Sequence, residues 1–225
     1  MQQQNNFETI LMSSAYAGSV RYYASMLSSN NIYIDPEEMG LNRSWAYNHC
    51  RIIGANGVQI LTIPVEKPLS GSRTAIKDII VSDHGDWRRI HWGALFSAYG
   101  KSPFFEYIEE DLYKIYHQPS KRLIDFNITI HNLIVDFLDI PVNASVSKNQ
   151  SMEPGLDLRK KVGEKLPDSL SIINVEYYQL WKDRFGFIPD LSIMDIMMNI
   201  GRETIFILHQ MNQLNNNVIL DKKMV

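Results

Sequence analysis

The stretch from Arg43 to Arg51 holds the densest group of chemically active side chains in this sequence. Tryptophan, asparagine, histidine and cysteine residues lie between the two arginines. So many large polar groups are a poor composition for a hydrophobic core, whereas two guanidinium groups suit a phosphate or carboxylate. We therefore expect a polar surface that binds a small anionic ligand, with Asn48 and Arg51 in contact with it. The alternative is that Arg51 pairs with an internal carboxylate.

A second candidate for chemistry is His91, four residues after Trp87. A helix places these two side chains on one face. Histidine titrates near neutral pH and is the usual general acid or base. The alternative is a half-buried structural histidine. Cys50 is either a nucleophile with a histidine as its base or a small buried hydrophobe.

Two further groups suit the binding of a small molecule. Asp157 and Arg159 precede two lysines, and a basic cluster on a loop can close over an anion; the alternative is a solvated run of charges. Each of the pairs Tyr22-Tyr23 and Tyr177-Tyr178 can bury one ring and turn the other toward a cleft. We select Tyr23 and Tyr178 as candidate ligand contacts.

These residues must be positioned by regular elements. The apolar patterns predict strands over 8–13, 31–34 and 76–82, a helix over 19–28 that Ser19 caps, and a hairpin that turns at residues 55–57. A strand–helix–strand opening favours a partly parallel sheet. Further helices are predicted from Asp86 to Tyr99, from Ser102-Pro103 onward, and over 121–138, 191–199 and 202–213.

The sequence thus predicts a single α/β domain with a mixed, partly parallel sheet and flanking helices. Residues 1–82 are the strand-rich part, and residues 83–225 are mainly helical. The polar range 143–171 is predicted to be a long loop or flap, which in compact domains is often functional.

Composition narrows the classes of function. The net charge of -3 gives no electrostatic reason to bind nucleic acid, and no run of apolar residues is long enough to span a membrane. The single cysteine excludes an internal disulfide and a cysteine-based zinc site, and it fits a reducing cytoplasm. The start lacks the pattern of a secretory signal. No common nucleotide, hydrolase or metal signature is present, so we expect no metal and no cofactor. The oligomeric state is not encoded in any pattern.

Read together, several segments resemble the WbqC-like protein family, in the form found in Bacteroidetes. The resemblance covers residues 9 to 208, and its carriers are Tyr22-Tyr23, NHCRIIGANGVQILTIPVEK, IKDIIVS, DWRRIHWGALFSAYGKSPFFEYIEEDLYKIY, LIDFN, DLR and YYQLWKDRFGFIPDLSIMDIMMNIG. It implies a transferase that acts on an amino sugar, or its nucleotide-linked form, in surface-polysaccharide biosynthesis. It also adds weight to the candidates Asn48, Arg51, His91, Asp157, Arg159, Tyr178 and Asp195.

The sequence departs from the family pattern in two places. Tyr47 and His49 stand where relatives tend to have arginines, and Ser14-Ala15-Tyr16 stands where many have a Gln-Pro-Tyr run. This leaves open a less charged ligand or a loss of activity. Asp195 lies in an apolar segment, where a buried carboxylate needs a partner, and we expect that partner to be an arginine.

We therefore expect transfer of an acyl or aminoacyl group to a sugar-linked amine. In this hypothesis Arg51 and Arg159 hold an anion, His91 is the general base, and Asn48 and Tyr178 orient the acceptor. The rival hypothesis is a non-catalytic binding or scaffold protein of a polysaccharide-assembly complex. A nucleotidylyltransferase-like enzyme is the third alternative.

Overall fold

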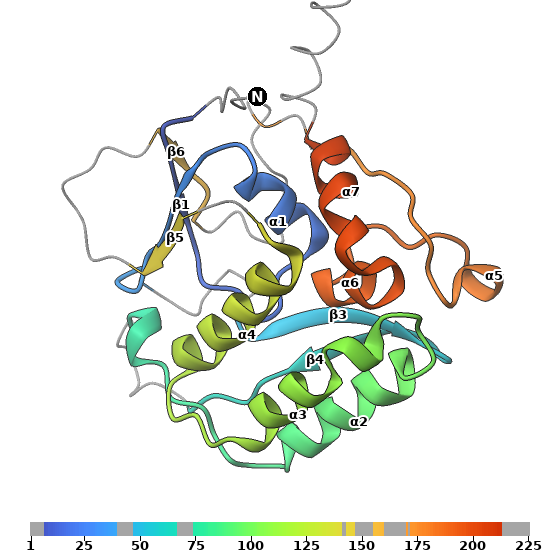
Figure 1. Ribbon diagram of the computed structural model, residues 1–225. Helices are drawn as coiled ribbons and strands as arrows, with labels where there is room; N and C mark the ends of the chain where they lie inside the picture. The colour runs from blue at the N-terminus through green and yellow to red at the C-terminus, as the bar shows by residue number, and fades with distance from the viewer. Residues whose placement is uncertain are drawn as a thin grey trace, which may run out of the picture.

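The computed structural model describes residues 7–39, 47–66, 74–140, 143–146, 155–159, 170 and 172–212. Parallel strands, a separate hairpin and helices alternate along this part of the chain (Figure 1). The strands are β1 (Thr9–Met12), β2 (Asn31–Ile34), β3 (His49–Gly54), β4 (Gly57–Thr62), β5 (Asn143–Val146) and β6 (Leu156–Asp157). The helices are α1 (Val20–Met26), α2 (Trp87–Tyr99), α3 (Glu109–His117), α4 (Leu123–Leu138), α5 (Lys182–Phe185), α6 (Ile193–Ile200) and α7 (Thr204–Met211), with short 3-10 turns η1 (Ile76–Asp78), η2 (Phe105–Tyr107) and η3 (Gly201–Glu203).

The first sheet is wholly parallel, with four strands in the order β5-β2-β1-β6. Helix α1 connects β1 to β2, and the Ser19 side chain caps it by accepting a hydrogen bond from the Tyr22 backbone N–H. β2 and β5 lie on one side of β1, and β6 lies on the other. The chain therefore adds β2 and β5 on one side of β1 and then returns to add β6 on the other side, so the direction of strand addition reverses at β1.

The second sheet is the antiparallel hairpin of β3 and β4. Gly57 follows the two-residue turn and has a φ of 96°, a conformation that glycine adopts without a steric penalty. Helix α2 packs on one side of β3 and α6 contacts it from another (Figure 1). The Ser192 N–H donates to the Arg51 carbonyl, while the Val20 N–H donates to Leu191, so the segment before α6 joins the hairpin to the start of α1.

The predicted fold class is confirmed: the described chain is α/β, with a parallel sheet, flanking helices and a helical C-terminal region. The first two strands, helix α1, the hairpin and helices α2, α4, α6 and α7 lie at the predicted places. Parallel and antiparallel strands form two separate sheets in the described ranges. No helix in these ranges is long and apolar enough to cross a membrane.

Three predictions of local structure are corrected. The strand over 76–82 is wrong: residues 76–78 form η1, and Ile80 makes an isolated bridge to Arg122, where α4 begins and no ladder can continue. The helix expected from Pro103 starts later, because the Phe104 N–H donates to the Met198 carbonyl. The range 143–171, predicted as a loop, contains β5 and β6; residues 147–154, 160–169 and 171 of it lie outside the described part.

Candidate functional site

The carboxyl ends of the parallel strands bring polar side chains to one edge of the first sheet. Ser13 follows β1, Asp35 follows β2 and Arg159 lies just beyond β6. In open parallel sheets, ligands bind outside the carboxyl ends of the strands at the point where the strand order reverses. That point lies between β1 and β6 in this chain. The same edge is therefore the first place to look for a site.

Arg159 is held at this edge by two carboxylates. Its Nη1 lies 2.6 Å from Asp35 Oδ2, and its Nη2 lies 2.7 Å from Asp157 Oδ2. These bonds raise the pKa of Arg159, Asp157 being the largest cause. The three charges sum to -1. Arg159 and Asp157 thus lie together as predicted, but their surroundings attract a cation more than an anion.

Glu38 lies next to this group and is only 3% exposed. The Tyr47 hydroxyl donates to its Oε1, whereas its Oε2 is buried without a hydrogen-bond partner. Burial raises the pKa of Glu38; hydrogen bonds from Ser13 and Tyr47 and the charge of Arg159 oppose this rise. A buried carboxyl with one unused acceptor is costly unless a donor reaches it.

Asn127 of α4 adds a second unused acceptor. Its Nδ2 donates to Ser14 Oγ (3.0 Å) and to the Tyr47 carbonyl (2.8 Å), and its buried Oδ1 has no partner. Tyr47 therefore contacts both Glu38 and Asn127. We call Glu38, Asn127 and Tyr47, with the neighbouring Ser13 and Ser14, the acceptor cluster. Two buried acceptor oxygens of this cluster, Glu38 Oε2 and Asn127 Oδ1, thus have no hydrogen-bond donor in the described chain.

His91 lies in a different, buried network. It is 4% exposed, its Nδ1 is 2.9 Å from the Tyr16 hydroxyl, and it also hydrogen-bonds to the Thr62 backbone. The Tyr16 hydroxyl lies 2.6 Å from that of Tyr116. Burial lowers the pKa of His91 to about 4. This is the environment of a neutral histidine that holds packed elements together.

Cys50 belongs to the same network. Its side chain is buried beside the Tyr16 hydroxyl, and burial raises the pKa of the thiol to about 12. A thiol with this pKa stays protonated at neutral pH and is a poor nucleophile. The environment therefore favours the small-hydrophobe interpretation of Cys50.

Asp195 is fully buried on α6, and its partners are neutral groups. Its Oδ2 accepts hydrogen bonds from the Tyr177 hydroxyl (2.8 Å) and Gln179 Nε2 (3.0 Å). Burial raises the pKa of Asp195 to about 6. The expected pairing of Asp195 with an arginine is therefore wrong: the tyrosine and glutamine side chains before α6 donate to Oδ2, while Oδ1 is buried without a hydrogen-bond partner.

Arg51 lies on β3, opposite Ile60 of β4, and is half-buried. Burial raises the pKa of Asp190, and the charges of Arg21 and Arg51 oppose that rise. Arg21 and Arg51 thus both lie within electrostatic range of Asp190.

The other residues predicted to contact a ligand lie in different parts of the described structure. The Asn48 amide donates to the Ile63 carbonyl, Tyr23 is buried with its hydroxyl 3.2 Å from His131 Nδ1, and Tyr178 is 53% exposed. The hydrogen bonds of the predicted residues thus place them in several separate networks of the described chain. Glu38 and Asn127 were not predicted. The acidic run Asp35-Pro36-Glu37-Glu38 directly after a strand was the available signal for Glu38.

The comparisons with known proteins agree with the resemblance seen in the sequence. A family model described as "WbqC-like protein family" matches residues 14–166, and the chain belongs to that family. An uncharacterized protein of Mycobacterium tuberculosis is 26% identical over 213 residues, covering 81% of this chain and 90% of the relative. No solved structure matches. No group of three or more metal-binding side chains occurs in the ranges that the structure describes.

Proposed function

We propose that this WbqC-like protein transfers an acyl or aminoacyl group to the amine of a nucleotide-linked amino sugar in surface-polysaccharide biosynthesis. The observation that carries the proposal is the pair of buried acceptors without a partner, Glu38 Oε2 and Asn127 Oδ1, whose side chains contact Ser13 and Ser14 just after β1. An amine offers two or three donors to such acceptors. The acidic surroundings favour an ammonium group over a phosphate at this position.

In the proposed step the Glu38 carboxylate accepts one proton from the bound ammonium group, which leaves a neutral amine. The amine nitrogen then forms a bond to the carbonyl carbon of an activated acyl donor, a thioester or an acyl phosphate. The bond from that carbon to the leaving group breaks, and the leaving group departs with its electron pair and takes up the second proton, which the nitrogen loses as it becomes an amide. A carboxyl with a raised pKa is better matched to this transfer than an ordinary one.

The other predicted residues take supporting roles. Arg159 fixes Asp35 and Asp157 at the sheet edge and is a positioning residue. Arg51, joined by Arg21, remains our candidate for an anionic part of a ligand. His91 is the alternative candidate for the general base. Its burial and its lowered pKa support a structural role instead.

Glu38→Gln and His91→Asn separate these assignments. For each variant we would measure thermal unfolding in the presence of uridine diphosphate-glucosamine, and the rate at which this sugar and an acetyl thioester form an amide. Glu106→Gln, at an exposed position, is the control. Saturating ligand at a hundred times its Kd adds about 2.7 kcal/mol to the native protein. The proposal expects E38Q to lose turnover and H91N to retain it. Normal turnover in E38Q, or ligand stabilisation without turnover in the native protein, contradicts the transferase; the second result is that of the binding-protein alternative.

A further inference from the structure

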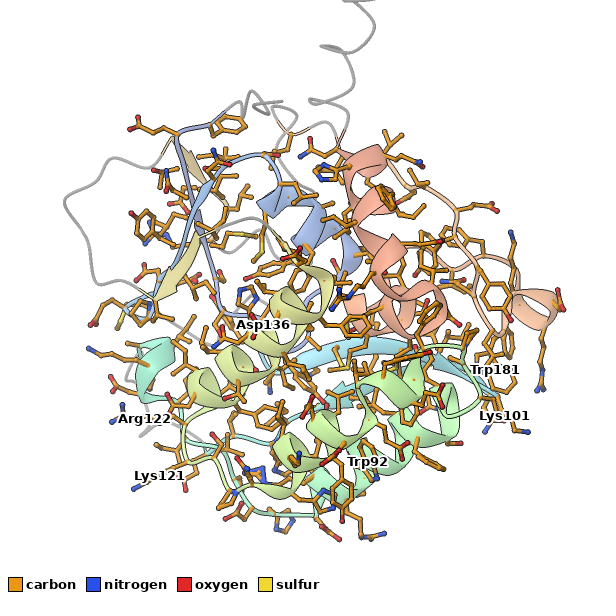
Figure 2. The ribbon with its side chains drawn as sticks, viewed as in Figure 1. Trp92, Lys101, Lys121, Arg122, Asp136 and Trp181 are labelled. Carbon is orange, nitrogen blue, oxygen red and sulfur yellow. The ribbon has the colours of Figure 1, made fainter. Side chains whose placement is uncertain are left out.

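A cavity of about 710 Å³ lies between η1, the start of α4 and the ends of β2 and β5, and neither Glu38 nor His91 is among its lining residues. Four charged residues line it: Lys77 and Asp78 from η1, and Arg122 and Asp125 from α4. Ile128 and Val146 contribute apolar wall. In Figure 2 Arg122 lies near η1, beside Lys121. The volume is in the range of small-molecule sites.

Backbone hydrogen bonds fix both charged walls. The Val81 N–H donates to the Lys121 carbonyl, and the Leu123 N–H donates to the Ile79 carbonyl, so the chain is tied on both sides of Arg122. The Lys77 N–H donates to the Pro36 carbonyl, which ties η1 to the end of β2. The cavity is thus formed by anchored backbone, which favours a preformed site.

The charges on these walls are unevenly paired. Lys77 Nζ lies 2.6 Å from Glu37 Oε1, and this partner raises the pKa of Lys77 while Arg122 opposes the rise. The Lys77 and Arg122 side chains thus lie close enough for their positive charges to repel each other. Within the described chain Arg122 makes no ion pair, and so it is the cation available to a ligand. The four lining charges sum to zero, so neither a simple anion nor a simple cation matches the whole cavity.

We infer that this cavity binds a small zwitterion, with its anionic group on Arg122, its ammonium group on Asp125 and its apolar body against Ile128 and Val146. The anionic group is a phosphate or a carboxylate, as in an amino sugar phosphate or an amino acid. A ligand that carries both charges can pair with Arg122 and Asp125 at the same time. A molecule that lacks one of the charges leaves one of these side chains unpaired and therefore binds less tightly. The inference is independent of the acceptor cluster.

Calorimetric titration tests the inference with four probes. Glucosamine 6-phosphate and L-leucine carry both charges, whereas glucose 6-phosphate and glucosamine each lack one. At least one zwitterion is expected to bind the native protein about tenfold more tightly than either single-charge probe. The zwitterion that does so identifies the source of the anionic group. Equal affinities for all four probes, or no binding of either zwitterion, overturns the inference.

Three variants locate the site. Arg122→Gln is expected to weaken the preferred zwitterion about tenfold, and Asp125→Asn to weaken it by a similar factor. Lys121→Gln, which removes an exposed neighbouring cation outside the lining, leaves the affinity unchanged. Unchanged zwitterion binding in both R122Q and D125N, with folding verified by circular dichroism, refutes the assignment. Glu38→Gln leaves this site intact, so failure here is distinguishable from failure of the proposed function.

Discussion

The two buried histidines predict that the protein loses stability in mild acid. His91 and His131 are 4% and 5% exposed, and burial lowers the pKa of each to about 4. In the unfolded chain each titrates at the ordinary value of about 6.5. The neutral form is therefore favoured in the native state. The stability that depends on this neutrality is present above about pH 6.5 and is lost as the pH falls toward 4.

The size of the effect follows from these values. Between pH 7 and pH 4.5 the unfolded chain takes up a proton at each histidine and the native state largely does not, which costs about 2.5 kcal/mol per histidine. Buried carboxyls act in the opposite sense. Asp195, with its pKa raised to about 6, gains stability over the same interval, and Glu38 and Asp190 are shifted in the same direction. A variant that lacks one histidine isolates that histidine's share.

His91→Asn is a suitable variant because asparagine retains a donor and an acceptor for Thr62 and Tyr16. Urea unfolding, followed by circular dichroism at pH 7 and pH 4.5, gives the free energy of unfolding of each protein. We expect the native protein to lose about 2.5 kcal/mol more than H91N between these pH values. Equal losses would show that His91 is protonated in the native state and would refute the assignment of a buried neutral histidine.

Three further predictions concern stability. Tyr16→Phe removes the hydroxyl that contacts both His91 and Tyr116, and we expect a loss of about 1 to 3 kcal/mol in urea unfolding at pH 7; no loss means that these contacts are not formed. Asp195→Asn removes a carboxyl whose raised pKa costs stability above about pH 6, so the variant should gain about 1.4 kcal/mol relative to the native protein between pH 5 and pH 8; a constant difference contradicts the raised pKa. Gly201→Ala places a Cβ 2.5 Å from the Phe104 ring at a φ of 60°, and a thermal scan should show a loss of about 2 to 4 kcal/mol; a native melting temperature contradicts this backbone geometry.

The fold could be predicted wherever local signals and tertiary packing agree. Apolar patterns located β1, β2 and the hairpin, and the Asn56-Gly57 turn fixed where the hairpin reverses. The segment 76–82 has the same apolar character but forms η1 and isolated bridges, since the chain opposite it turns into α4. β5 and β6 are short strands in a polar range. They exist because β1 and β2 offer open edges, which no local pattern reveals.

The site was harder to predict, because its residues come together only through the strand order. Asp157 and Arg159 were selected for their charge, and they do meet at the sheet edge with Asp35. His91 was selected for its ordinary pKa, which burial changes. Asn127 lies in a helix whose apolar pattern gives no sign that the amide faces Ser14 and the carbonyl of Tyr47. Residue type indicated possible chemistry, whereas burial and unused hydrogen-bond capacity depend on tertiary contacts.

The central claim is that Glu38 at the carboxyl edge of the parallel sheet receives a sugar amine. Its most direct test is a calorimetric titration of uridine diphosphate-glucosamine and uridine diphosphate-glucose into the native protein and Glu38→Gln. The native protein should bind uridine diphosphate-glucosamine about tenfold more tightly than uridine diphosphate-glucose, and E38Q should bind both equally. Equal Kd values in the native protein, or an undiminished preference for the amine in E38Q, would contradict the claim.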